Sequence, residues 1–140
     1  MIERIVRPDS AAEAEFRQIL LRTMALMIAA DRVIDPDEIK VVARVYGRLL
    51  GERVWGDTVL DEIRAAQADG TQLIELLKMY APSLSVHDKD FLMHAAFAVC
   101  AADEYLSVDE KQDLENMALA LGLETRRWEE LRAQFNEEDL

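Results

Sequence analysis

The sequence predicts an all-α protein, a single domain of about seven helices, and three observations lead to this prediction. Residues that begin and end helices recur along the 140-residue chain, whereas Gly and Pro number only five and three. No segment alternates apolar and polar residues for long enough to form a convincing strand. The apolar content of 51% beside 31% charged residues is typical of a soluble globular protein. We therefore expect one helical domain that spans residues 1–140.

Four helices are expected in the first 80 residues, and each follows a residue that can cap a helix. Ser10 starts a Ser-x-x-Glu capping box, and Asp35 with Pro36 is a strong start signal for the second helix. Asp57 and Thr71 can cap the next two helices. The four helices are expected over about residues 11–30, 36–50, 58–69 and 72–80.

Three further helices are expected in the rest of the chain. Ser85, Ser107 and Thr125 provide the caps, and Gly122 ends the second of the three helices. The three helices are expected over about residues 86–102, 108–121 and 126–135. The tail, residues 136–140, is expected to fray.

Two ten-residue segments of the chain are related to each other. Residues 29–38 and 101–110, 72 positions apart, are identical at five of ten positions: Ala29/Ala101, Ala30/Ala102, Asp31/Asp103, Asp37/Asp109 and Glu38/Glu110. Each segment follows an apolar helical stretch and precedes an amphipathic one. The sequence therefore predicts two pseudo-symmetric helix–loop–helix repeats, over approximately residues 10–51 and 85–123. The first helix of each repeat is apolar almost all round, so we expect both to be buried.

Carboxylates gather at both repeated loops, and helix capping explains most of them. Asp35 and Ser107 are placed to cap, and the acidic residues of the following turns suit a helix N-terminus. Asp31 and Asp103 are different, because each ends a helix, where the dipole disfavours an anion. Internal hydrogen bonds or a nearby Arg could compensate them, and we favour this explanation. The alternative is a bound hard cation, Ca²⁺ or Mg²⁺, although neither loop has EF-hand spacing.

Other reactive residues do not form a recognisable catalytic set. His87 and His94 are seven residues apart, too far for a zinc pair of the H-E-x-x-H kind. His94 is interpreted as a core or boundary histidine, and Cys100 as a small core residue. The chain has no P-loop, dinucleotide-binding or nucleophile-elbow motif, so we expect no enzymatic activity.

The charge of the chain limits its partners. The net charge is −12, with 10 basic and 13 acidic residues in 1–70 (−3) and 6 basic and 15 acidic residues in 71–140 (−9). Such a chain should repel nucleic acid and anionic membranes and suits a cation or a basic protein partner. The single cysteine, and the lack of a signal peptide or an apolar stretch that could span a membrane, lead us to expect a cytoplasmic protein.

The repeated pattern Ala-Ala-Asp-x-x-Ile/Leu-[Asp/Ser]-x-Asp-Glu and the ending of the sixth expected helix, residues 118–123, resemble the TerB-like family. That family includes the tellurite-resistance protein TerB and the N-terminal domain of DjlA-type co-chaperones. The resemblance covers about residues 15–135 and implies an all-helical domain of two pseudo-repeats with links to stress and envelope functions. It also implies a divalent-metal site, whose residues by motif match are Asp31, Glu38, Asp103 and Glu110. The family usually has Gly after the motif Asp, where this chain has Arg32 and Glu104.

The resemblance and the residues together predict a non-catalytic interaction or sensing module of the bacterial stress response. In this interpretation the paired acidic loops bind a divalent cation. The alternative is a metal-independent structural adaptor whose acidic face docks a basic protein partner. The sequence does not determine the oligomeric state.

Overall fold

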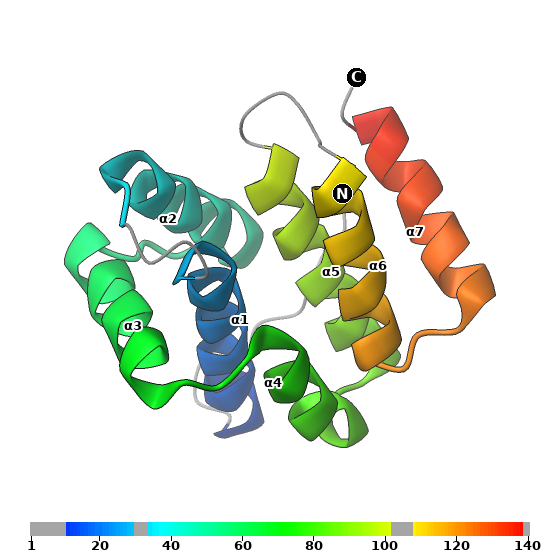
Figure 1. Cartoon of the computed structure of the whole chain (residues 1–140), viewed down its shortest axis with the longest axis horizontal. Helices are drawn as coiled ribbons and strands as arrows, with labels where there is room; N and C mark the ends of the chain where they lie inside the picture. The colour runs from blue at the N-terminus through cyan, green and yellow to red at the C-terminus, as the bar shows by residue number, and fades with distance from the viewer. Residues whose placement is uncertain (1–10, 30–33, 102–107, 139–140) are drawn as a thin grey trace. The chain divides into compact units, whose positions relative to one another are not determined.

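The computed structural model describes residues 11–29, 34–101 and 108–138. They form seven α-helices and one short 3₁₀ helix, and no strand occurs among them (Figure 1). The all-α prediction is therefore confirmed. The chain divides after Gln72 into two compact units. The two expected repeat halves fall in different units, and their pseudo-symmetry remains a prediction.

Unit 1 contains three helices, α1 (Ala11–Ala29), α2 (Pro36–Leu50) and α3 (Gly56–Asp69). Helix α1 packs against both α2 and α3, and α2 also packs against α3. The apolar side chains of α1 are buried along most of its length, as its composition predicted. The most deeply buried apolar side chains of the unit are Leu20, Met24, Ala25, Val42, Val59 and Ile63.

Unit 2 contains α4 (Leu73–Tyr80), the 3₁₀ helix η1 (Ala81–Ser83), α5 (Val86–Ala101), α6 (Val108–Ala120) and α7 (Thr125–Glu138). Helix α5 packs against α6 and α7, and α4 packs against α6. Helix α5 is the most deeply buried of the unit, which confirms the expectation for this apolar helix. Its fully buried apolar side chains are Phe91, Leu92, Met93, Ala95 and Ala96.

Local signals in the sequence explain where most helices begin and end. The Asp35 carboxylate accepts a hydrogen bond of 2.8 Å from the Asp37 amide, and Pro36 occupies the first turn of α2. The Ser85 hydroxyl accepts one of 3.0 Å from the Asp88 amide at the start of α5. Gly51 ends α2 with a φ of 68°, a left-handed conformation that side chains disfavour.

Two expected caps and one expected terminus differ from the structure. Helix α3 begins at Gly56, so Asp57 lies inside its first turn, and the N-cap is Trp55, which makes no side-chain capping bond. Helix α4 begins at Leu73, and the Thr71 hydroxyl instead donates to the Asp69 carboxylate at 3.3 Å. Helix α7 continues to Glu138, so it includes three residues of the tail that we expected to fray.

Candidate functional site

The four residues implied as metal ligands are only partly within the described residues. Asp31 and Asp103 lie outside them, as does the expected cap Ser107. Glu38 lies in the first turn of α2 in unit 1, and Glu110 lies in the first turn of α6 in unit 2. Both glutamates are half-buried. The structure therefore locates one residue of each pair, and the metal site stays a prediction.

Both glutamates lie at the N-terminus of a helix. The free amides and the dipole at a helix N-terminus stabilise a negative charge in the first turn. Asp35 shares this environment at α2, where its carboxylate accepts a hydrogen bond from the Asp37 amide. A half-buried carboxylate at each helix start is an oxygen ligand of the kind that hard cations prefer. Among the described residues, no group of three or more His, Cys, Asp or Glu side chains is placed to hold a metal ion.

Glu110 has a neighbour that the sequence analysis did not connect with it. The thiol of Cys100, on α5, is buried and reduced, and it hydrogen-bonds to the Glu110 carboxylate on α6. Burial first, then the charge of Glu110 and the hydrogen bond to it, and then Asp113, raise the pKa of the thiol to about 12. Cys100 is thus a small buried residue, as predicted, and its thiol is protonated at neutral pH, whereas a nucleophilic cysteine needs its thiolate.

An ionic link joins the first and last helices of unit 1. Arg22 on α1 pairs with Glu62 on α3 through its Nε and with Asp69 through its Nη1, at 3.2 Å. Gln18, one turn before Arg22, donates to the same Glu62 at 3.0 Å. The hydrogen bond to Glu62 is the largest cause of a raised pKa of Arg22. Arg22 is therefore held by carboxylates of its own unit.

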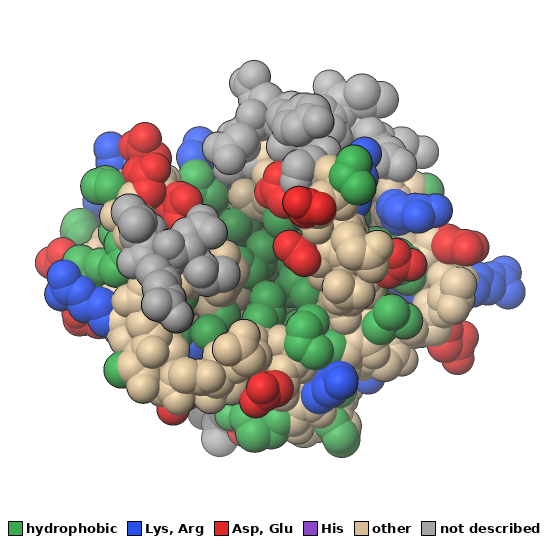
Figure 2. Space-filling view, in the orientation of Figure 1, with side chains coloured by type: hydrophobic (Ala, Val, Ile, Leu, Met, Phe, Trp, Pro, Cys, Tyr) green, Lys and Arg blue, Asp and Glu red, His purple; other side chains and the backbone are tan. Residues whose placement is uncertain are grey.

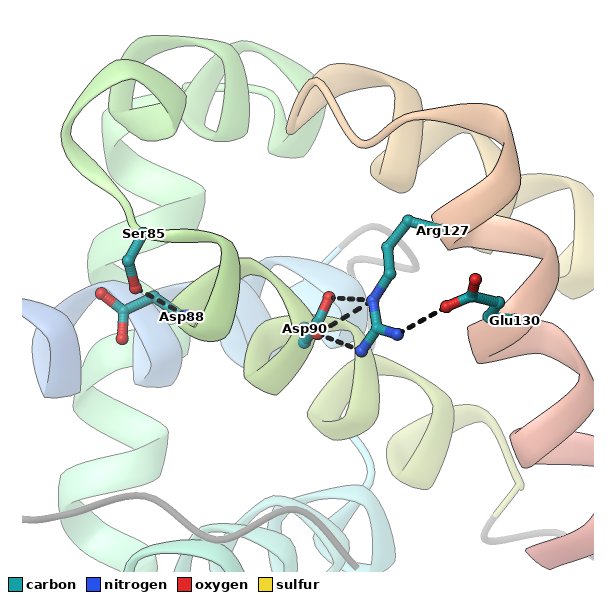
Figure 3. Close-up of polar contacts among 5 residues, drawn as sticks. All are labelled: Ser85, Asp88, Asp90, Arg127 and Glu130. Atoms are coloured by element: carbon teal, nitrogen blue, oxygen red, sulfur yellow. Dashed lines mark hydrogen bonds and ion pairs between the residues drawn. The ribbon is translucent and has the colours of Figure 1, made fainter.

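A second ionic link joins α5 and α7 in unit 2. The Arg127 guanidinium binds both oxygens of Asp90, with Nε at 3.1 and 3.0 Å and Nη2 on Oδ2, and its Nη1 reaches Glu130 at 2.9 Å (Figure 3). Asp90 is only 5% exposed. A buried carboxylate needs such a partner, and the two-pronged geometry suits Arg.

The two histidines lie in different environments. His87 is exposed on the first turn of α5, whereas His94 is buried and packs edge-on against Phe135 of α7, with ring centroids 5.1 Å apart. Phe135 also stacks on Phe97 at 4.5 Å. His94 is therefore a core histidine, as the sequence analysis proposed.

Acidic side chains are prominent on α6. Asp109 and Asp113 are exposed, and Glu110 and Glu115 are half-buried. Red side chains lie over this helix on the face that Figure 2 shows. Lys111 is the basic residue of α6. This helix is therefore the described element of unit 2 best suited to meet a basic partner.

Sequence reasoning missed the partners of Arg22, Asp90 and Cys100. The ion pairs join residues 37 to 47 positions apart, and no local pattern reveals such contacts. The available signal was the polarity of Arg22 and Asp90 beside the apolar stretches of α1 and α5. Because an isolated buried charge is costly, it predicts a partner without identifying it.

Membrane insertion has no support in the helices. No helix within the described parts of the chain is long and apolar enough to cross a membrane.

Comparison with known proteins gives one match. The model of a protein family described as tellurite resistance protein TerB matches residues 17–133, which is most of the chain. Comparisons with curated proteins and with solved structures gave no match.

Proposed function

The chain belongs to the tellurite resistance protein TerB family, and from this membership we propose that it is a non-catalytic interaction and sensing module of a bacterial stress response. The stress is tellurite or envelope damage, as the family and its DjlA-type relatives suggest, and the module works in the cytoplasm. The match over residues 17–133 is the observation that carries the proposal.

A divalent cation, Ca²⁺ or Mg²⁺, is the signal that we propose for this module. The proposed ligands are Asp31 and Glu38 in the first repeated loop and Asp103 and Glu110 in the second. The supporting observation is that Glu38 and Glu110 are both half-buried in the first turn of a helix, where the helix dipole favours a negative charge. Oxygen ligands of this kind suit hard cations.

The absence of catalysis is part of the same proposal. Cys100 is the strongest nucleophile that the sequence offers, and its thiol is buried against Glu110 with a pKa raised to about 12. A thiol in this state is protonated at physiological pH and reacts slowly. Its contact with Glu110 supports a role for both residues in packing α5 against α6.

Thermal unfolding in the presence of the ion tests the cation proposal. An ion that binds only the folded protein, present at 100 times its dissociation constant, should add about 2.7 kcal/mol of stability. The variant Asp31→Asn with Asp103→Asn should lose this gain and keep its helical circular-dichroism spectrum. The matched control is Asp61→Asn with Glu129→Gln, which removes the same charge from exposed sites on α3 and α7.

The control should respond to Ca²⁺ or Mg²⁺ as the wild type does. Equal thermal shifts in all three proteins at matched ionic strength would show that the ions act only by screening the −12 charge, and metal binding would be rejected.

A metal-independent adaptor is the second candidate, and the charge distribution favours it. Residues 71–140 carry −9 of the net charge, and α6 exposes Asp109 and Asp113. A Lys/Arg-rich peptide should then bind without added metal and weaken as salt rises. Asp109→Asn with Asp113→Asn should reduce the affinity, whereas Asp61→Asn with Glu129→Gln should not. Peptide binding that is insensitive to salt and to both variants would reject the adaptor.

A further inference from the structure

In both units an ion pair joins the first helix of the repeat to the last helix of the unit, and the two pairs have opposite polarity. In unit 1 the cation, Arg22, is on the first helix of the repeat, α1, and its carboxylates are on α3. In unit 2 the carboxylate, Asp90, is on the first helix of the repeat, α5, and its cation, Arg127, is on α7. We call α3 and α7 the closing helices, because each is the last helix of its unit. The polarity of the link between the repeat's first helix and the closing helix is thus reversed.

Both closing helices present an apolar stripe to an apolar first helix. Helices α1 and α5 are both apolar almost all round, and each precedes one copy of the repeated segment. Each closing helix offers one stripe of buried apolar side chains: Val59, Ile63 and Ala66 on α3, and Trp128, Leu131 and Phe135 on α7. Hydrophobic attraction is not directional. A closing helix could therefore dock on the wrong partner during folding, within one chain or between two copies.

Corresponding positions of the repeat face the closing helix in both units. Gln18 and Asp90 are 72 residues apart, as the repeated segments are, and each contacts the closing helix of its own unit: Gln18 reaches Glu62, and Asp90 reaches Arg127. Arg22 lies one turn after Gln18 on the same face of α1. In the register of the repeat, Arg22 and Asp90 therefore lie one helical turn apart.

Exchanging the closing helices would place like charges together. Docking α3 on α5 would bring Glu62 to Asp90, and docking α7 on α1 would bring Arg127 to Gln18, one turn from Arg22. Asp90 is only 5% exposed, so a carboxylate as its neighbour would leave it without compensation. We propose that the reversed polarity of the Arg22–Glu62 and Asp90–Arg127 pairs directs each closing helix to its own unit and blocks exchange between the halves or between chains. Specificity of this kind arises from repulsion in the wrong pairing as well as attraction in the right one.

A cycle of charge swaps tests this proposal. The unit 1 swap is Arg22→Glu with Glu62→Arg, and Asp69→Asn is added to remove a carboxylate that would repel the new one. The unit 2 swap is Asp90→Arg with Arg127→Asp. Either swap alone gives both units the same polarity, whereas the combined variant restores opposite polarities. The full chain is refolded from denaturant at about 10 mM ionic strength, where charges act over about 30 Å, and the yield of native monomer is measured by size exclusion and circular dichroism.

Each yield is expressed as a fraction of the wild-type yield. The proposal predicts that each swap alone lowers the monomer yield. The yield of the combined variant should be several-fold above the product of the two single yields. Purely local damage would instead multiply, because independent effects are additive in free energy. A combined yield equal to that product, zero included, would overturn the proposal, as would wild-type yields from both single swaps. If one swap alone fails to fold, recovery in the combined variant supports the proposal, and failure in both overturns it.

An ion pair elsewhere in unit 1 provides the matched control. Arg17 and Glu52 lie 3.4 Å apart and join α1 to the segment after α2, and neither residue belongs to the closing helix. Arg17→Glu with Glu52→Arg, combined with the unit 2 swap, should give the product of the two single yields. A recovery as large as that of the combined variant of the unit 1 and unit 2 swaps would show that the effect is not specific to the closing helices. This result would overturn the proposal.

Discussion

Units 1 and 2 carry related copies of one segment, yet different contacts hold the first helix of the repeat to the last helix of the unit. In unit 1, α3 contributes the aliphatic residues Val59 and Ile63 and two carboxylates that bind Arg22. In unit 2, α7 contributes an aromatic cluster centred on Phe135 and the cation Arg127. The comparison teaches that similarity at the loops does not extend to the packing of the helices.

The largest expected effect concerns the aromatic cluster of unit 2. Phe135 is 1% exposed and contacts His94, Phe97 and Trp128. Phe135→Ala should lower the free energy of unfolding by about 3–5 kcal/mol, because it removes a large buried ring and leaves a cavity. Urea unfolding monitored by circular dichroism measures the loss. A change below about 1 kcal/mol would contradict the central role of this ring.

The next largest effect compares the two ionic links. Arg127→Met should lower the free energy of unfolding by roughly 1–3 kcal/mol, because Asp90 would remain buried without its partner. This loss lies between those typical of exposed and of buried ion pairs. Arg22→Met should cost less, since Asp69 is mostly exposed and can be hydrated. The two unfolding free energies are compared in the same buffer. Equal losses would show that the burial of Asp90 does not distinguish the units.

Helix caps provide a comparison in which the units should agree. Asp35 caps α2 in unit 1, and Ser85 caps α5 in unit 2, each through a hydrogen bond to a backbone amide. Asp35→Ala and Ser85→Ala should each cost about 1 kcal/mol in denaturant melts. If both are neutral, the caps do not fix these helix starts.

A loss of stability at high pH is a further comparison, in which the units should differ. Burial raises the pKa of Cys100 in unit 2 from 9.0, and that of Tyr46 in unit 1 from 10.0, in both cases to about 12. The unfolded chain releases each proton first, so stability should fall as pH rises above about 9 for Cys100 and above about 10 for Tyr46. Each group contributes at most about 1.4 kcal/mol per pH unit.

Cys100→Ala should therefore remove the early part of this fall, and Tyr46→Phe the later part. Urea midpoints measured from pH 8 to 10.5 distinguish the two contributions. A wild-type midpoint that stays constant over that range would be inconsistent with both raised pKa values.

Much of the fold could be predicted from the sequence because helix ends are encoded locally. Asp35 with Pro36, and Ser85, gave the starts of α2 and α5, and Gly51 gave the end of α2. The start of α3 was misassigned to Asp57, because a cap without a side-chain bond, at Trp55, leaves no local signal.

The contacts within the candidate site were harder to predict from the sequence, because they are tertiary contacts. The hydrogen bond between Cys100 and Glu110 joins two helices, and the pairing of Asp90 with Arg127 joins residues 37 positions apart. Composition and periodicity indicate that such residues are buried, but not which partner they meet. Asp31 and Asp103, recognised from the repeat, lie outside the described residues.

An NMR titration tests the central claim, cation sensing by both repeated loops, most directly. Ca²⁺ or Mg²⁺ is added to ¹⁵N-labelled protein at constant ionic strength, and backbone amide shifts are followed residue by residue. The account predicts saturable shifts in both segments, residues 30–38 and 102–110, with the same midpoint concentration. Small, unsaturable shifts spread over the exposed carboxylates of the chain would contradict it.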